Sequence, residues 1–199
     1  MKQIEIEIKF FLAHVNAVRD QIHALGAESR GRVFETNIRY EDALNSLMKN
    51  RTLLRLRKDS KVTLTFKSEM PDKDHDFKIH RELEVEINDF QTMNNIIQSI
   101  GFHQEQVYEK WRETYTLGGT VICLDTMPFG DFIEIEGKKE QIRAVADKIG
   151  LIWEERIRSN YLALFETVKE GLDLSFSDIT FQNFKSVTFN PADFFAQAR

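Results

Sequence analysis

Charged and apolar residues alternate near the start of the chain, where the sequence reads Glu5-Ile6-Glu7-Ile8-Lys9. This period of two predicts a β-strand with Glu5, Glu7 and Lys9 on one face and isoleucines on the other. Two carboxylates about 7 Å apart on one face repel each other unless a cation lies between them. The charged face is therefore either the solvated side of an edge strand or part of a cation site.

The acidic alternation occurs twice more, over residues 82–87 and 132–136. Each of the three acidic strands is followed by apolar residues at helical spacing and then by a glycine, which favours a helix that ends there. The repeated module is an echo of architecture and does not prove duplication, since helix lengths and spacings differ. The expected helices cover residues 15–25, 90–100 and 142–149, with Gly26, Gly101 and Gly150 as their stops.

Basic residues take the same alternating positions on other predicted strands. Residues 53–57 and 62–67 predict a hairpin, residues 108–112 another strand, and residues 120–125 a further strand after the Gly118-Gly119 turn. A less regular strand is expected over 32–40, a loop or short helix over 41–49, an exposed loop over 70–76, and a fourth helix from about Glu154 to Lys169.

The last thirty residues differ in character from the rest of the chain because phenylalanines crowd them. We expect one domain over 1–168 and an aromatic-rich extension over 169–199. The extension is expected to pack on the domain or on a partner subunit, which would make a homodimer.

Composition narrows the class of protein. The chain has 199 residues and a net charge of −5, whereas proteins that bind nucleic acid by bulk electrostatics are normally basic. The single cysteine, Cys123, permits no internal disulfide and fits a reducing compartment. Charged alternation follows Met1 closely, with no export signal, and no apolar run reaches membrane-spanning length. We expect a cytoplasmic protein that binds neither nucleic acid nor membrane.

Charges gather on strand faces whose opposite sides are apolar and can be covered by helices. Such a sheet either leaves its charged face open to water or closes so that the charges line a wet interior. Clustered carboxylates bind hard divalent cations such as Mg²⁺ or Mn²⁺, while Arg and Lys bind phosphate oxygens. Both together on one surface indicate phosphoryl or nucleotidyl chemistry on a polyphosphate.

Other phosphate and metal motifs are missing from the sequence. It contains no GxxxxGK[ST], GxGxxG, HExxH or paired CxxC, and its five histidines are scattered. Cys123 lies on an apolar strand without an obvious base partner, so a buried structural thiol is the better interpretation than a nucleophile. The alternating charges are therefore the chemistry that the sequence offers.

These residues resemble the signature of the CYTH superfamily, also called triphosphate tunnel metalloenzymes. Glu5-Ile6-Glu7-Ile8-Lys9 resembles its ExExK motif, and companion motifs follow in the family's order over about residues 1–168. The companions are Leu54-Arg55-Leu56-Arg57, Lys67, Arg81-Glu82-Leu83-Glu84, Lys110-x-Arg112, Leu124-Asp125, Gly130-x-Phe132-Ile133-Glu134-Ile135-Glu136 and Ser159-Asn160-Tyr161-Leu162.

The resemblance implies an α+β fold, a closed antiparallel eight-stranded β tunnel (a barrel) with helices packed outside. It implies a small-molecule triphosphate substrate and Mg²⁺ or Mn²⁺ as cofactor. Carried over by position, the metal ligands are Glu5, Glu7, Glu82, Glu84, Asp125, Glu134 and Glu136, the last two and the first two most directly. The phosphate contacts are Lys9, Arg55, Arg57, Lys67, Lys110 and Arg112. Arg81 fits the motif, but its parity turns it away from Glu82 and Glu84, so its orientation stays open.

Family resemblance does not choose the reaction. The chain is most similar to class IV adenylyl cyclases, which convert ATP to cyclic AMP and pyrophosphate, and the alternative is a phosphohydrolase of tripolyphosphate, thiamine triphosphate or a nucleoside triphosphate. Lys9 is a candidate general acid or base, and a phosphate contact is its other role. A non-catalytic module that binds polyphosphate or nucleotide would keep the bases but could lose the carboxylates. A dimerising protein with merely solvated acidic strands would show no metal-dependent thermal shift.

Overall fold

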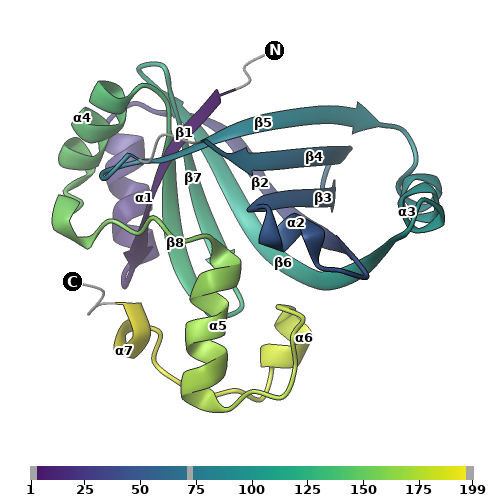
Figure 1. Ribbon diagram of the computed structural model, residues 1–199. Coiled ribbons are helices and arrows are strands. Elements are labelled where there is room, and N and C mark those ends of the chain that lie inside the picture. The colour runs from purple at the N-terminus through teal and green to yellow at the C-terminus, as the bar shows by residue number, and fades with distance from the viewer. Residues whose placement is uncertain (1–3, 71–73, 196–199) are drawn as a thin grey trace.

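The computed structural model describes residues 4–70 and 74–195, and its strands form one closed antiparallel ring in the order β1-β5-β4-β3-β2-β6-β7-β8. The ring and the helices outside it confirm the predicted tunnel fold (Figure 1). The strands are β1 (Ile4–Leu12), β2 (Glu28–Asp42), β3 (Thr52–Lys58), β4 (Val62–Glu69), β5 (Lys78–Ile87), β6 (Phe102–Leu117), β7 (Thr120–Met127) and β8 (Gly130–Glu136).

The first acidic strand closes the ring. On one side β1 pairs with β5, with Glu7 opposite Lys78, and on the other it pairs with β8, with Lys9 opposite Glu134. It is therefore not an edge strand, and the alternative of a solvated edge is wrong. Because successive side chains alternate between faces, one closed ring separates the charged residues from the apolar ones along every acidic strand.

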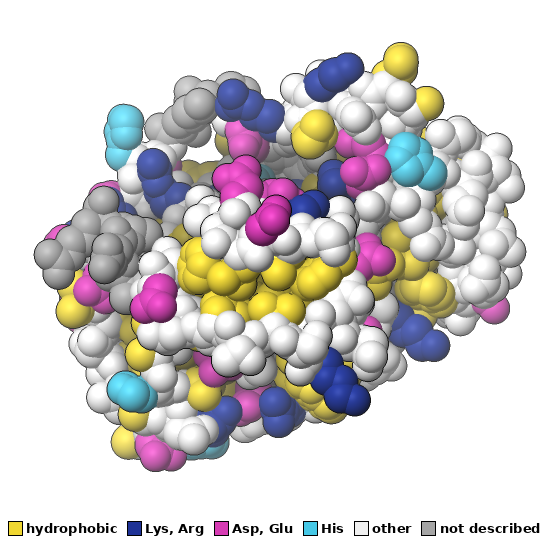
Figure 2. Space-filling view, turned by 90° about the horizontal axis from the view of Figure 1, so that it is seen from below, with side chains coloured by type: hydrophobic (Ala, Val, Ile, Leu, Met, Phe, Trp, Pro, Cys, Tyr) yellow, Lys and Arg dark blue, Asp and Glu magenta, His cyan; other side chains and the backbone are white. Residues whose placement is uncertain are grey.

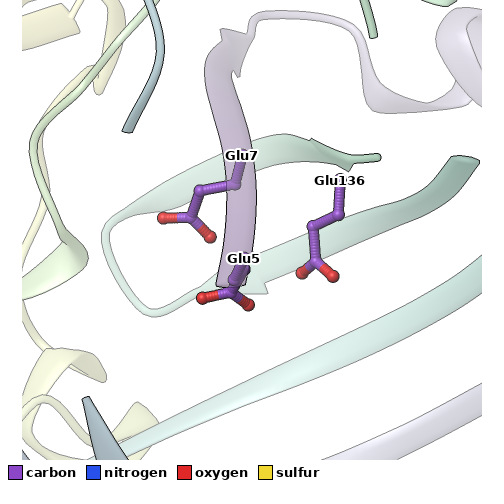
Figure 3. A group of neighbouring side chains, drawn as sticks. All are labelled: Glu5, Glu7 and Glu136. Carbon is purple, nitrogen blue, oxygen red and sulfur yellow. The ribbon is translucent and has the colours of Figure 1, made fainter. Parts of the chain in front are cut away.

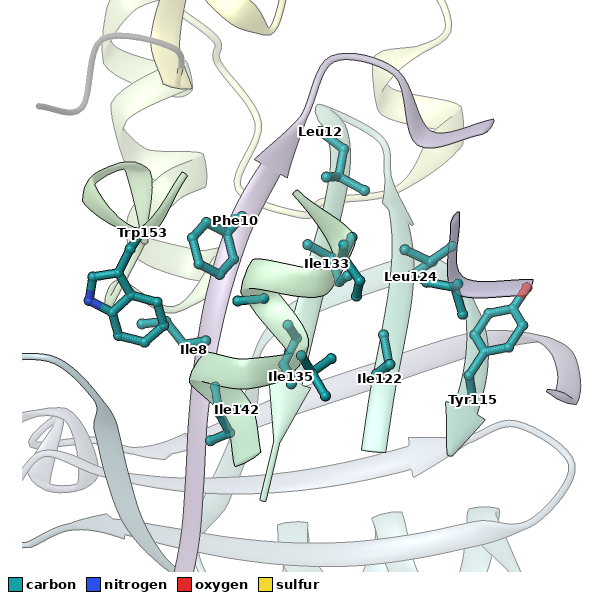
Figure 4. Close-up of a cluster of buried hydrophobic side chains, with 14 of the residues drawn as sticks. Ile8, Phe10, Leu12, Tyr115, Ile122, Leu124, Ile133, Ile135, Ile142 and Trp153 are labelled. Carbon is teal, nitrogen blue, oxygen red and sulfur yellow. The ribbon is translucent and has the colours of Figure 1, made fainter. Parts of the chain in front are cut away.

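The apolar faces of the strands form a core beneath the helices outside the ring. The helices and the 3₁₀ turn are α1 (Val15–Ala24), α2 (Ser46–Lys49), α3 (Phe90–Ser99), α4 (Lys139–Ile149), η1 (Trp153–Glu155), α5 (Tyr161–Leu172), α6 (Phe181–Phe184) and α7 (Ala192–Phe195). Ile8 of β1, Ile122 of β7 and Ile135 of β8 are fully buried in this core with Ile142 of α4 (Figure 4). None of the described helices is both long and apolar enough to cross a membrane.

The fourth helix begins later than the sequence pattern predicts, at Tyr161 and not near Glu154. The amide of Ile157 donates to the carbonyl oxygen of Lys9 over 2.7 Å, which holds the preceding segment extended against β1. Asn160 then caps the helix by accepting a hydrogen bond from the amide of Ala163 over 2.8 Å. The apolar spacing that predicted a helix from Glu154 therefore includes a segment that is bound to β1 in an extended conformation.

Strands β2 and β6 are longer than predicted. They pair with each other along β2 from Glu28 to Asp42. The ladder shifts register between Ser29 and Arg32, where Gly31 has φ +93°. A bulge of this kind interrupts the regular alternation, and the predicted strand over 32–40 begins directly after it. Parts of three predicted segments lie outside the described ranges. They are residues 1–3 at the N-terminus, residues 71–73 of the expected loop and residues 196–199 of the extension.

The described part of the extension packs against the tunnel of its own chain. Only the second half of β6 pairs with β7, and the free edge of its first half receives Ile179, whose amide donates to Val107 O over 2.8 Å. Phe184 and Phe195 join Phe129 and Phe165 in a second core. Apolar side chains also gather in the middle of the underside, the face where Figure 1 places α5, α6 and α7 (Figure 2). The division at residue 168 stays a prediction.

Candidate active site

A cavity of about 1090 Å³ runs through the ring and is bordered by all eight strands, with charged side chains from every strand except β7, and by α5. Of the thirteen residues predicted for the site, Asp125 alone does not border the cavity. The other twelve are Glu5, Glu7, Lys9, Arg55, Arg57, Lys67, Glu82, Glu84, Lys110, Arg112, Glu134 and Glu136. Of the two arrangements that the sequence left open, the structure has the one in which the charged faces line the interior.

Three of the predicted metal ligands form a cluster. Glu5, Glu7 and Glu136 each offer a carboxylate oxygen, and these oxygens lie within 4.8 Å of one another. They come from β1 and β8, which are neighbours in the ring (Figure 3). Three oxygen donors at this spacing suit a hard divalent cation such as Mg²⁺ or Mn²⁺.

Burial and mutual repulsion strain the charges of the cluster. Burial raises the pKa of Glu5 to about 8, with contributions from Glu7 and Glu136 and against the charge of Lys67. Burial would also raise the pKa of Glu7, but Lys78 and other lysines lower it to about 2. The cluster therefore holds buried carboxylates that repel one another, and a bound divalent cation would offset both costs.

Lysines of neighbouring strands bind the cluster from one side. Lys67 Nζ is 2.5 Å from Glu5 and 2.6 Å from Glu82, and Lys78 Nζ is 2.6 Å from Glu7. Glu82 thus lies beside the cluster through Lys67 and is not one of its three members. Lys67 is predicted to contact phosphate, and here it also joins the acidic and basic parts of the tunnel.

The other predicted metal ligands contact bases. Glu134 pairs with Lys9 and Arg112. Asp125 accepts hydrogen bonds from Lys110 over 2.9 Å, and from Arg112 over 2.6 and 2.5 Å. These two carboxylates hold the bases in place, Glu134 at the cavity and Asp125 behind its wall. The prediction that they bind metal stays a prediction.

Two arginines of β3 form a second basic group. Arg57 Nη2 is 3.3 Å from Glu84 Oε2, and Arg55 Nη2 donates to Thr65 over 3.2 Å. Both arginines follow the alternation that the sequence predicted for residues 53–57. With Lys110 and Arg112 on β6, they present cations to the cavity from two strands that flank β2.

Lys9 lies where the two kinds of charge meet. It pairs with Glu134, and its Nζ is 4.0 Å from the ring centroid of Tyr161. The phenol of Tyr161 donates to Asp125 over 2.8 Å, so the first turn of α5 closes over this part of the tunnel. Tyr161 belongs to the Ser159-Asn160-Tyr161-Leu162 motif, but sequence reasoning gave it no role.

Sequence reasoning also missed other residues that border the cavity, among them Glu35, Lys78 and His80. Lys78 and His80 share the parity of Glu82 and Glu84 on β5, so the alternation could have identified them. Glu35 lies on β2, whose cavity face also carries the apolar Val33, so the charge pattern did not mark this face. Arg81 has the opposite parity, is exposed, and does not border the cavity, which answers the question of its orientation.

Unpartnered polar atoms on the tunnel wall test whether the site suits a charged ligand. Arg55 Nε, His80 Nε2 and Glu35 Oε2 are buried without a hydrogen bond, although buried polar atoms normally have a partner. An oxygen of a polyphosphate ligand could accept the hydrogen bond that Arg55 Nε has available. Cys123 is buried at the same wall, and burial raises its thiol pKa to about 12. This agrees with the prediction of a structural thiol.

Comparison with known proteins identifies the family. The CYTH domain matches residues 3–164, and the chain belongs to the CYTH family. A Methanocaldococcus jannaschii protein named "Putative adenylate cyclase" is 26% identical over 173 residues, which are 81% of this chain and 98% of that protein.

Solved structures share the fold. One of a Pyrococcus horikoshii OT3 protein is 27% identical, with a TM-score of 0.67 over 79% of this chain and 96% of that one. A Hippeastrum protein is 22% identical, with a TM-score of 0.61 over 82% of this chain and 97% of that one. The Hippeastrum protein is described as a "Putative adenylyl cyclase" that "reveals a dominant triphophatase activity".

Proposed function

We propose that this protein is a divalent-metal-dependent enzyme that acts on a triphosphate inside its tunnel. The observation that carries the proposal is the presence, in one cavity, of a three-carboxylate cluster and of Lys and Arg side chains from several strands. The carboxylates alone suit only a cation, and the bases alone suit only an anion. Together they suit a phosphate chain with its metal.

The side chains divide the work between binding and orientation. Glu5, Glu7 and Glu136 would hold Mg²⁺ or Mn²⁺, which when bound supplies charge to polarise phosphate oxygens. Arg57 and Arg55 bind phosphate oxygens through their planar forks. Lys110 and Arg112, anchored by Asp125, extend the same grip from β6. Fixed donors that do not reorganise stabilise the charge that develops during transfer.

The reaction proposed first is cyclisation of ATP to cyclic AMP and pyrophosphate. The name of the Methanocaldococcus jannaschii relative supports it, and the cavity of about 1090 Å³ is large enough for a whole nucleoside triphosphate. The second candidate is hydrolysis of a triphosphate. The triphosphatase activity described for the Hippeastrum protein favours it, although that protein resembles this chain in fold alone.

A panel of substrates tests the proposal. ATP, thiamine triphosphate and inorganic tripolyphosphate are each incubated with Mg²⁺ or Mn²⁺, and phosphate, pyrophosphate and cyclic AMP are measured separately. Cyclic AMP with equal pyrophosphate identifies a cyclase, and phosphate without cyclic AMP identifies a phosphohydrolase. Tripolyphosphate binding without turnover of any substrate would overturn the enzyme proposal in favour of a binding module.

A further inference from the structure

Glu35 is an acid in the middle of the basic wall. Its side chain borders the cavity but is only 2% exposed. Its Oε2 lies 3.5 Å from Lys110 Nζ and its Oε1 lies 3.8 Å from Arg112 Nε, both longer than charge-assisted hydrogen bonds. Oε2 accepts no hydrogen bond from any described residue.

The acidic cluster lies on the far side of the tunnel from Glu35. In the ring order, β2 is four strands from β1 in either direction, so the wall that bears Glu35 faces the wall that bears Glu5 and Glu7. Bases on β3 and β6 flank Glu35 on both sides. A triphosphate held by those bases therefore passes beside the Glu35 carboxylate.

A carboxylate at this place works against phosphate binding because it repels phosphate oxygens and offsets the flanking cations. A glutamine of the same shape would bind phosphate better. An unpartnered carboxylate oxygen instead suits a ligand group that donates a hydrogen, since a hydroxyl or water can satisfy it. The reacting O–H group of a phosphoryl transfer is such a donor.

We propose that Glu35 is a catalytic residue that accepts the proton of the attacking hydroxyl. This inference rests on the proposed function. The attacking and leaving oxygens lie on opposite sides of the phosphorus in such transfers, so a base on one wall leaves the other wall for the leaving group.

The step balances without another reactant. The O–H proton passes to the Glu35 carboxylate while the hydroxyl oxygen forms a bond to phosphorus. The bond from that phosphorus to its bridging oxygen breaks, and the bridging oxygen keeps the electron pair. With ATP as substrate the attacking group is a ribose hydroxyl and pyrophosphate leaves. With water as the attacking group, a phosphate is released.

Binding of a triphosphate should raise the pKa of Glu35, as a proton acceptor requires. Burial favours the neutral acid, but Lys110, Arg112 and the two arginines of β3 lower the pKa of Glu35 to about 2. A bound triphosphate occupies the same cations and adds negative charge, which raises the pKa of the carboxyl group. The base therefore becomes stronger when substrate is present.

Glu35→Gln separates a proton acceptor from a residue that merely positions bases. We expect kcat to fall about a hundredfold or more with KM unchanged or lower. The Kd for tripolyphosphate without metal, measured by calorimetry, should be unchanged or tighter by up to about tenfold, because a repelling charge is removed. Glu35→Asp should keep part of the turnover because it keeps the carboxylate.

Glu113→Gln is the matched control. Glu113 is a half-buried acid on the adjacent strand β6, but it faces outward and pairs with Arg19 over 2.8 Å, so kcat should stay near that of the unmodified protein. The inference is overturned if Glu35→Gln keeps kcat within threefold, or if it loses kcat together with a tenfold weaker tripolyphosphate Kd. If the unmodified protein turns over no triphosphate, the proposed function fails first and this inference with it.

Discussion

Glu5, Glu7 and Glu136 illustrate how strand parity turns a local sequence pattern into chemistry. Each carboxylate is placed by its neighbours in the ladder, since Glu7 lies opposite Glu136 between β1 and β8. Burial, together with the charges of Glu7 and Glu136, raises the pKa of Glu5, and a cation between the carboxylates would offset this cost. At the level of single residues, the site is an arrangement of charges that oppose each other until ligands bind.

Glu136→Gln should weaken Mn²⁺ binding by tenfold or more and abolish metal-dependent turnover with the fold intact. One of three charged oxygen donors becomes a neutral amide, and even outer-shell changes at metal sites cost about that much. Calorimetric Mn²⁺ titration and circular dichroism measure the two parts. Glu86→Gln is the control because Glu86 is exposed and pairs with Lys61. Unchanged Mn²⁺ affinity in Glu136→Gln would contradict its role as a ligand.

Arg57→Ala should raise the KM for triphosphate and weaken tripolyphosphate binding by about tenfold to a hundredfold. A hydrogen bond to a charged group contributes about 1.5–3 kcal/mol, and 1.4 kcal/mol is a factor of ten. Arg81→Ala, which removes an exposed arginine outside the cavity, should leave both values unchanged. Equal effects of the two substitutions would mean that net charge and not tunnel position governs binding.

Secondary-structure elements outside the ring determine how the tunnel wall is supported. Segment 157–161 holds β1 from outside through the Ile157–Lys9 hydrogen bond, and α5 brings Tyr161 against Lys9. The extension completes the free edge of β6 through Ile179. The family match ends at residue 164, so this chain adds its own support to a shared tunnel.

Phe184→Ala should lower the free energy of unfolding by about 3–5 kcal/mol because it empties a buried aromatic position. Phe184 is 7% exposed, and its ring packs on Phe129 and Phe165 of the tunnel domain and on Phe176. Urea unfolding gives the value, and Leu44→Ala, at a 73% exposed position, serves as the control. A change as small as that of the control would mean that the extension adds no stability to the tunnel.

Asp74→Asn should remove a pH-dependent contribution to the stability of the fold. Asp74 precedes β5 and forms an ion pair with Lys139 of α4. Asp74 Oδ2 is 2.6 Å from Lys139 Nζ, and this contact, with hydrogen bonds from two backbone amides, lowers the pKa of Asp74 to about 2 from 3.8. A lowered pKa adds stability above pH 3.8 that is lost as pH falls toward 2. The difference in Tm between the two proteins should therefore be constant near neutral pH and shrink below about pH 4. A difference that persists at pH 2 would contradict this account.

The whole molecule brings together charges from strands that are distant in sequence. The closed ring sets the cluster on β1 and β8 against Glu35 on β2, with bases on the strands between them. Such an interior carries strong local fields of both signs although the chain is only modestly acidic overall. A ligand that neutralises the basic part should therefore stabilise the fold as a whole.

Tripolyphosphate at a hundred times its Kd should add about 2.7 kcal/mol to stability, which corresponds to a rise of about 5–10 °C in Tm. Thermal unfolding at low ionic strength measures the shift, which should diminish as salt screens the exposed mouths. Orthophosphate at the same concentration should give a smaller rise because it spans fewer bases. Equal shifts with the two anions would mean that no extended phosphate site exists.

Much of the architecture could be predicted from the sequence because alternation at Glu5–Lys9 and 132–136 is regular. The ion pairs between tunnel side chains could not be predicted, since they depend on the order of the strands in the ring and on their register. The family resemblance placed Glu134 with the metal ligands, and in the structure its neighbours across the ladder are Lys9 and Cys123, and it pairs with Lys9. Glu35 was missed because the cavity face of β2 also carries the apolar Val33, so charged and apolar residues do not alternate cleanly there.

Closure of the ring also determines how firmly the tunnel can hold a ligand. Among the described residues every strand has a partner on each side, but the ladders differ in length: β2 and β6 pair over most of their length, whereas β1 and β5 pair only from Ile4 to Glu7. A ligand in the tunnel therefore meets a wall that is held most firmly behind Glu35 and least firmly beside the acidic cluster.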